Sequence, residues 1–220
     1  MRTIKKVASH IFIDGFGGMT QGLFATLIIG TMIQQIGLLI GGSTGNVIYL
    51  LGKAAAALTS AGIGVGVAVK YGESPLVTVS AAVAAMVGGY AGKITGGTFF
   101  VDGNAVLAGP GEPLGAFIAA FAGITCGHLV SGKTKVDIIV TPVITIGAGS
   151  VVGLLVGPPI SQMMTGLGSI INWATEQRPF IMGIVVSVVM GMVLTLPISS
   201  AALGIILNLS GLAAGAATIG

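Results

Sequence analysis

Three polar residues, Asp102, Asn104 and Glu112, follow one another within an otherwise apolar region of this chain. Carboxylates and amides form hydrogen bonds with the hydroxyl groups of sugars. Carboxylates combined with backbone carbonyls also suit Na⁺ or H⁺. A sugar site, an ion site and the decoration of an ordinary loop are three open interpretations of this group.

Glu112 lies in the segment 109–115, which reads Gly-Pro-Gly-Glu-Pro-Leu-Gly between two apolar stretches. A carboxylate at membrane depth costs several kcal/mol unless it is paired, solvated or protonated. Two prolines and three glycines do not form a regular helix, and irregular backbone at that depth must be buried in protein or line a watery cavity. The segment therefore favours a polar site for a solute, and a loop at the surface is the alternative.

Other residues that could carry chemistry have simpler interpretations. His128 could relay a proton or bind substrate, or it could be a hydrogen-bonded histidine at the membrane interface. We expect a loop ion pair for Asp137 and a helix cap for Asn46. The single cysteine, Cys126, is expected to be a packing residue, since it cannot form a disulfide within the chain.

No enzyme signature is present in the sequence, which lacks Walker A, His-Glu-x-x-His, Cys-x-x-Cys and Gly-x-Ser-x-Gly motifs. We therefore expect no catalytic residue, no cofactor and no metal ion. A Lys/Arg patch with interleaved aromatics is also missing, so nucleic acid is not an expected partner.

The composition is that of an integral membrane protein. Of 220 residues, 54% are hydrophobic and 7% are charged, whereas soluble domains carry roughly 25% charged residues. The 38 glycines are scattered through the apolar runs, and small residues let membrane helices approach closely. The expected fold is an all-α, polytopic transmembrane helix bundle with broken or re-entrant segments.

Charged residues and prolines divide the chain into apolar runs long enough to cross a bilayer. We expect one transmembrane domain over residues 1–220, and Pro158 and Pro159 are expected to end its fifth span. Residues 94–113 should form a re-entrant or lid segment. Residues 160–175 should form an amphipathic helix, either at the interface or inside a vestibule. The predicted spans lie near 17–41, 47–69, 75–92, 114–131, 137–157, 179–198 and 201–220.

The lysines and arginines between these spans predict the orientation. With the N-terminus inside, six of them fall on the inner side and two or three on the outer side, which favours a cytoplasmic N-terminus. The last apolar run stops without a polar anchor, so we expect the chain to be a fragment of a longer bundle.

A weak internal echo relates two parts of the chain. Ser74-Pro75-Leu76 and Glu112-Pro113-Leu114 are each followed, at the same offset, by an Ala-Ala pair. Each proline should lie in the first turn of a helix. Transporters are often built from repeats.

Several ordered motifs resemble a known membrane-protein family. The chain is similar to the second family of phosphotransferase-system enzyme IIC domains, the IIC-like sugar permeases, on the segments 109–117, 133–142, 157–161 and 194–202. The resemblance implies a dimeric permease in the bacterial inner membrane. It also implies a sugar that is phosphorylated on the cytoplasmic side by a separate IIB component. A carboxylate from a broken segment binds the sugar in better-understood IIC groups, and Glu112 matches it in character.

The chain departs from a complete phosphotransferase system because it carries no soluble IIA or IIB domain. Separate IIA and IIB components are therefore expected partners, together with the lipid bilayer and a second copy of the chain. Two other functions remain open. One is an ion- or proton-coupled transporter or channel that is independent of phosphotransfer, and the other is a non-transporting membrane sensor or scaffold.

Overall fold

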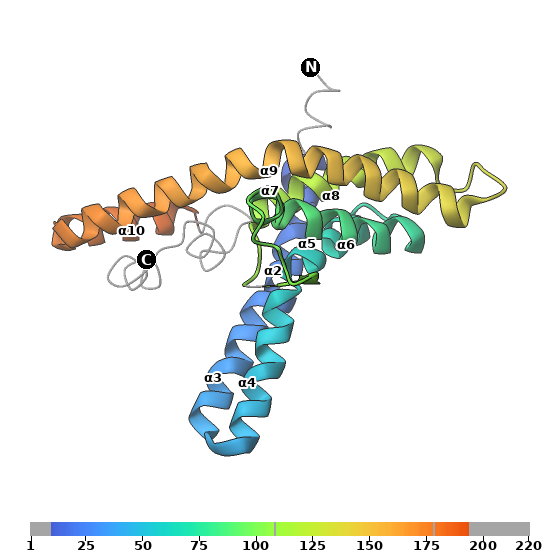
Figure 1. Ribbon diagram of the computed structural model, residues 1–220. Coiled ribbons are helices and arrows are strands. Elements are labelled where there is room, and N and C mark those ends of the chain that lie inside the picture. Colours follow the sequence, from blue (N-terminus) through green and yellow to red (C-terminus); the bar gives the residue numbers. More distant parts are fainter. Residues whose placement is uncertain (1–9, 108, 178, 194–220) are drawn as a thin grey trace. The chain divides into compact units, whose positions relative to one another are not determined.

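The structure, a computed structural model, describes residues 10–107, 109–177 and 179–193. It consists almost entirely of helices (Figure 1), which confirms the predicted all-α class. The chain divides into two compact units between Pro158 and Pro159.

The first unit begins with one long, irregular helical segment. It consists of η1 (His10–Gly15), α2 (Phe16–Leu23), η2 (Phe24–Ile28) and α3 (Ile29–Ile40), where η marks a π-helical stretch. Residues Ile13–Ile40 are long and apolar enough to cross a membrane, close to the predicted span 17–41. The turn after α3 uses Gly41 and Gly42, both at φ 64°, a conformation that glycine adopts at little cost.

The returning segment is a broken helix formed by α4 (Gly42–Ala57) and α5 (Thr59–Lys70). The two helices meet at Leu58 with a bend of 52°. They pack side by side with the first segment (Figure 1), through close approaches of Gly18 to Gly66 and of Gly22 to Gly62. Asn46 lies exposed inside α4 and does not cap it; Gly41 occupies the cap position. The prediction for Asn46 was therefore wrong, because the turn at Gly41, where φ is positive, starts the helix earlier.

Helix α6 (Pro75–Gly89) and helix α8 (Pro113–Val130) pack against each other in opposite directions. Gly88 near the end of α6 faces Gly115 near the start of α8. At the other end, the Ser74 and Ser131 hydroxyls are 3.0 Å apart. Both helices begin with a proline in the first turn, which confirms the expectation drawn from the sequence echo.

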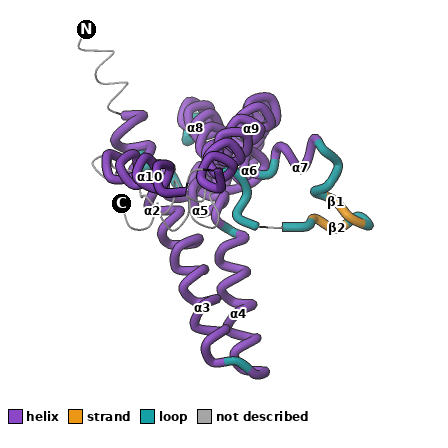
Figure 2. The backbone as a smooth tube through the Cα atoms, turned by 90° about the vertical axis from the view of Figure 1, so that its left-hand side faces the viewer, coloured by secondary structure: helices purple, strands orange, loops and turns teal. Residues whose placement is uncertain are grey.

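Along the chain, α6 is followed by α7 (Ala91–Thr95) and by a hairpin of β1 (Phe100–Val101) and β2 (Asn104–Ala105), which precede α8. Figure 2 shows the hairpin at the end of a loop that leaves the helices. Its two-residue turn has Asp102 at φ 51° and Gly103 at φ 77°, as Asp-Gly hairpin turns require. This hairpin occupies part of the predicted re-entrant segment 94–113.

Helix α9 (Asp137–Gln177) starts in the first unit and continues past the two prolines. The expectation that Pro158 and Pro159 end the span was wrong. The prolines remove only two backbone donors, which a membrane helix tolerates when the freed carbonyls find other partners. The predicted amphipathic segment 160–175 is thus the second half of one helix.

In the second unit, α10 (Pro179–Val193) covers the described part of the predicted span 179–198. The predicted span 201–220 lies outside the described residues. Among the described helices, three are long and apolar enough to cross a membrane, or four with the bent α4–α5 pair.

Candidate functional site

Glu112 is the N-cap residue of α8. Its backbone is extended, and its carboxylate accepts hydrogen bonds from the backbone N–H groups of Leu114, at 3.1 Å, and Gly115. These donors belong to the first turn, where a helix has N–H groups without helical partners. A carboxylate has about four acceptor positions, so capping leaves some of them for another donor.

The loop before Glu112 is attached to α5 and α6. The Ser60 hydroxyl of α5 donates to the Pro110 carbonyl at 2.9 Å, and the Glu112 N–H donates to the Gly89 carbonyl at 2.7 Å. Gly111 is at φ 75°, and a Cβ on it would overlap the Ser60 hydroxyl oxygen. The loop therefore requires glycine here for two independent reasons.

Tyr90 joins this loop to the break between α4 and α5. Its hydroxyl contacts the Gly109 carbonyl, and it lies 3.3 Å from the carbonyl of Ala57, the last residue of α4. The Tyr90 side chain is buried, with 1% of its surface exposed. Two interruptions of regular structure, the break at Leu58 and the loop 109–112, thus lie next to each other.

This meeting of two backbone interruptions has the groups of a small polar site. It brings together the partly exposed Glu112 carboxylate and the buried hydroxyls of Ser60 and Tyr90. It also contains the backbone carbonyls that these two hydroxyls contact in the loop and at the end of α4. Such a set can accept hydrogen bonds from a polyhydroxyl solute or coordinate a cation.

The other two residues of the predicted cluster lie on the hairpin. Asp102 and Asn104 are exposed, and the Asn104 amide donates to the Asp102 carbonyl at 3.3 Å. They share the connection that leads to Glu112, as the sequence predicts, but the Asn104 side chain bonds to the Asp102 backbone across the turn.

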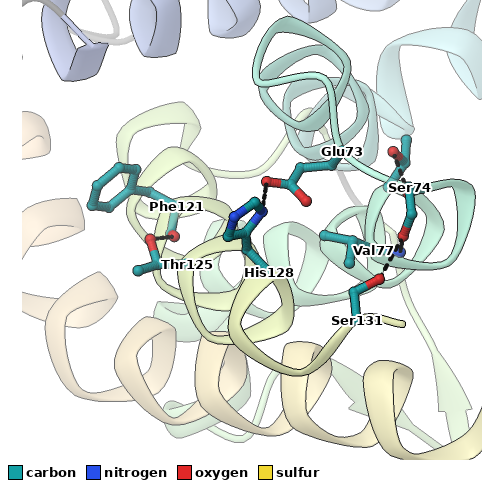
Figure 3. Close-up of polar contacts among 8 residues, drawn as sticks. Glu73, Ser74, Val77, Phe121, Thr125, His128 and Ser131 are labelled. Atoms are coloured by element: carbon teal, nitrogen blue, oxygen red, sulfur yellow. Dashed lines mark hydrogen bonds and ion pairs between the residues drawn. The ribbon is translucent and has the colours of Figure 1, made fainter. Parts of the chain in front are cut away.

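His128 lies near the opposite end of α8 from Glu112. Sixteen residues at 1.5 Å each separate them by about 24 Å, so one small solute cannot contact both. Figure 3 shows His128 facing Glu73, with Nδ1 and a carboxylate oxygen 2.9 Å apart. The imidazole is 71% exposed and the Glu73 side chain 9%, which fits an interfacial, hydrogen-bonded histidine.

Two further polar groups lie on neighbouring elements: Asp137 begins α9, and Tyr71 follows α5 with its ring beside Phe121 of α8. Asp137 accepts hydrogen bonds from the Gly132 N–H at 2.9 Å and the Thr141 hydroxyl at 2.6 Å, so its carboxylate fixes the start of α9. Burial, and to a smaller extent the Asp14 carboxylate, raises the pKa of Tyr71 to about 12. That phenol therefore stays neutral at physiological pH.

Sequence reasoning missed Ser60 and Tyr90. Their partners in the loop lie 50 and 19 residues away along the chain, and no local pattern reports such contacts. The hairpin, in contrast, had a usable signal in the Asp102-Gly103 dipeptide.

Comparison with protein families gives a match to the phosphotransferase system EIIC family over residues 13–220. Comparisons with curated proteins and with solved structures give no match. The family match covers nearly the whole chain, and the apolar helices described above are those of a multi-pass membrane protein. This chain therefore belongs to the phosphotransferase-system EIIC family and is a membrane permease of that type.

Proposed function

We propose that this permease binds a small sugar at residues 109–112 and that the Glu112 carboxylate accepts hydrogen bonds from the sugar hydroxyls. One observation carries the proposal. The loop that holds Glu112 lies against the break between α4 and α5, to which the Tyr90 hydroxyl links it. In transporters, solute sites form where helices are discontinuous, because unwound backbone offers polar groups there.

Family membership supports a sugar as the solute and separate IIA and IIB components as partners. We propose that the sugar enters from the side of the β1–β2 hairpin, where Asp102 and Asn104 are exposed. The cytoplasmic N-terminus and the homodimer predicted from the sequence remain part of this proposal. His128, about 24 Å from Glu112 along α8, would meet the solute only on the inner side.

The direct test is sugar binding by the purified, full-length chain in nanodiscs. A panel of ¹⁴C-labelled hexoses and hexitols is offered to the wild type and to Glu112→Gln. Since hydrogen bonds to a charged group contribute about 1.5–3 kcal/mol, the variant should bind the retained sugar at least about tenfold more weakly. Equal binding by the two proteins would refute the site.

A second candidate function is an ion- or proton-coupled carrier. The observation that favours it is the same carboxylate beside carbonyls of interrupted helices, a combination that also suits Na⁺ or H⁺. Sugar accumulation in liposomes with an imposed Na⁺ or proton gradient, and with no phosphoryl donor, would favour this candidate. Accumulation only with IIA, IIB and a phosphoryl donor would favour phosphotransfer.

A further inference from the structure

Tyr90 contacts more elements of the site region than its place in the sequence suggests. It is the residue between α6 and α7. Its hydroxyl contacts carbonyls of α4 and of the loop before Glu112. Its ring lies 5.3 Å from that of Phe99, next to the hairpin, and the Lys93 amine lies 5.3 Å from its centre. One buried side chain therefore contacts the helix break, the loop and the residue that precedes the hairpin.

Ser60 supplies a second attachment from the other helix of the broken pair. Its side chain is fully buried, and its hydroxyl donates to the Pro110 carbonyl at 2.9 Å. Glycine at positions 89 and 111 lets the two backbones approach this hydroxyl, because a Cβ at either position would overlap it. The contact is thus built into a tightly packed place.

Both hydroxyls contact backbone carbonyls where helical structure is interrupted. The Ser60 hydroxyl donates to the Pro110 carbonyl, and the Tyr90 hydroxyl lies at the carbonyls of Gly109 and Ala57. A hydrogen bond within the protein contributes about 0.5–1.5 kcal/mol net, so these two side chains favour the loop conformation in which their contacts form. Glycine at 109 and 111, both at positive φ, leaves the backbone free to adopt others when the hydroxyls are removed.

We propose that Tyr90 and Ser60 are positioning residues that hold residues 109–112 against the α4–α5 break. The Glu112 carboxylate and the broken helix then move as one unit. The importance of this unit for the solute rests on the proposed function, but its existence does not.

The test is amide hydrogen exchange of the full chain in nanodiscs, without solute. Tyr90→Phe keeps the ring beside Phe99 and Lys93 and removes only the hydroxyl. Loss of about one hydrogen bond should speed exchange about tenfold in peptides covering both 57–62 and 111–116. Ser60→Ala should speed exchange in 111–116. Thr125→Val is the control, since it removes a hydroxyl bond to the Phe121 carbonyl on the exposed side of α8.

Each other outcome contradicts the proposal. Unchanged exchange in Tyr90→Phe would show that the hydroxyl does not hold the loop. Faster exchange in 111–116 alone would refute the link to the helix break. Faster exchange throughout, including 125–131, would assign Tyr90 to general stability instead.

A solute measurement separates this inference from the proposed function. With the labelled sugar that the wild type retains, Tyr90→Phe should raise Kd about fivefold, within the loss expected for one hydrogen bond, and leave the number of sites unchanged. Unaltered Kd with faster exchange would limit Tyr90 to fixing the loop and overturn its role at the solute. If Glu112→Gln binds normally, the proposed function fails while the exchange result still stands.

Discussion

At the scale of single residues, Glu112 is unusual because it caps a helix with a side chain that is not a preferred cap. Ser, Thr, Asp and Asn are the usual N-caps, and Ser74 fills that role at the matching position of α6, with its hydroxyl 3.4 Å from the Val77 N–H. A serine at 112 would still cap α8, as Ser74 caps α6 with one hydrogen bond where Glu112 accepts two. The longer, charged side chain is therefore explained better by a second task than by capping.

Gly89 offers a residue-scale prediction about the packing beside the loop. In Gly89→Ala the new methyl group would overlap the Ser60 hydroxyl, and such overpacking costs about 1–3 kcal/mol. We expect a lower melting temperature in detergent, measured with a thiol-reactive dye at Cys126. Adding Ser60→Gly should restore part of the loss, and a double variant as unstable as Gly89→Ala would contradict this packing.

At the scale of elements, the seam between the first helical segment and the α4–α5 pair depends on glycine. The glycines at 18, 22, 62 and 66 let carbonyl oxygens of one helix approach the backbone of the other, as is common between membrane helices. The bend at Leu58 and the π-helical stretch η2 lie along this same seam. Both long segments therefore depart from regular α-helical geometry where they pack against each other.

The seam predicts opposite effects for two equal substitutions. Gly66→Ala places a methyl group against the Gly18 carbonyl, whereas a Cβ at Gly147 of α9 meets no atom within 4 Å. We expect Gly66→Ala to lose about 1–3 kcal/mol and Gly147→Ala to gain up to about 1 kcal/mol from helix propensity. Reversible unfolding in mixed micelles measures both, and equal effects would show that the seam is not tightly packed.

The elements also show which features could be predicted from the sequence. The starts of α6 and α8 follow from Pro75 and Pro113, because proline suits the first helical turn. The continuation of α9 through Pro158 and Pro159 could not be predicted, since it depends on what surrounds the freed carbonyls. The position of Glu112 before a helix was predicted, but the contacts of Ser60 and Tyr90 with its loop arise only from folding.

At the scale of the whole molecule, α8 places the hairpin and the loop 131–136 at its two ends. If α8 crosses the membrane, these two exposed regions face opposite sides. From the sequence rule for basic residues we predict that the lysines at 133 and 135 face the cytoplasm.

Two engineered cysteines test this topology in a Cys126→Ser background. An impermeant maleimide should label Asn104→Cys in intact cells and Thr134→Cys only after permeabilisation, since both positions are exposed in the structure. Labelling of both from one side would show that α8 does not cross the membrane. The reverse pattern would place the N-terminus outside.

The measurement that tests the central claim most directly is sugar binding by Glu112→Ser. Serine keeps the cap of α8 and removes the carboxylate, so the helix and its melting temperature should be preserved. Our account predicts that Glu112→Ser loses at least about tenfold in affinity for the labelled sugar and that Ser74→Ala, which removes the matching cap of α6, binds it normally. Wild-type affinity in Glu112→Ser would show that Glu112 is only a helix cap and would contradict the proposed site.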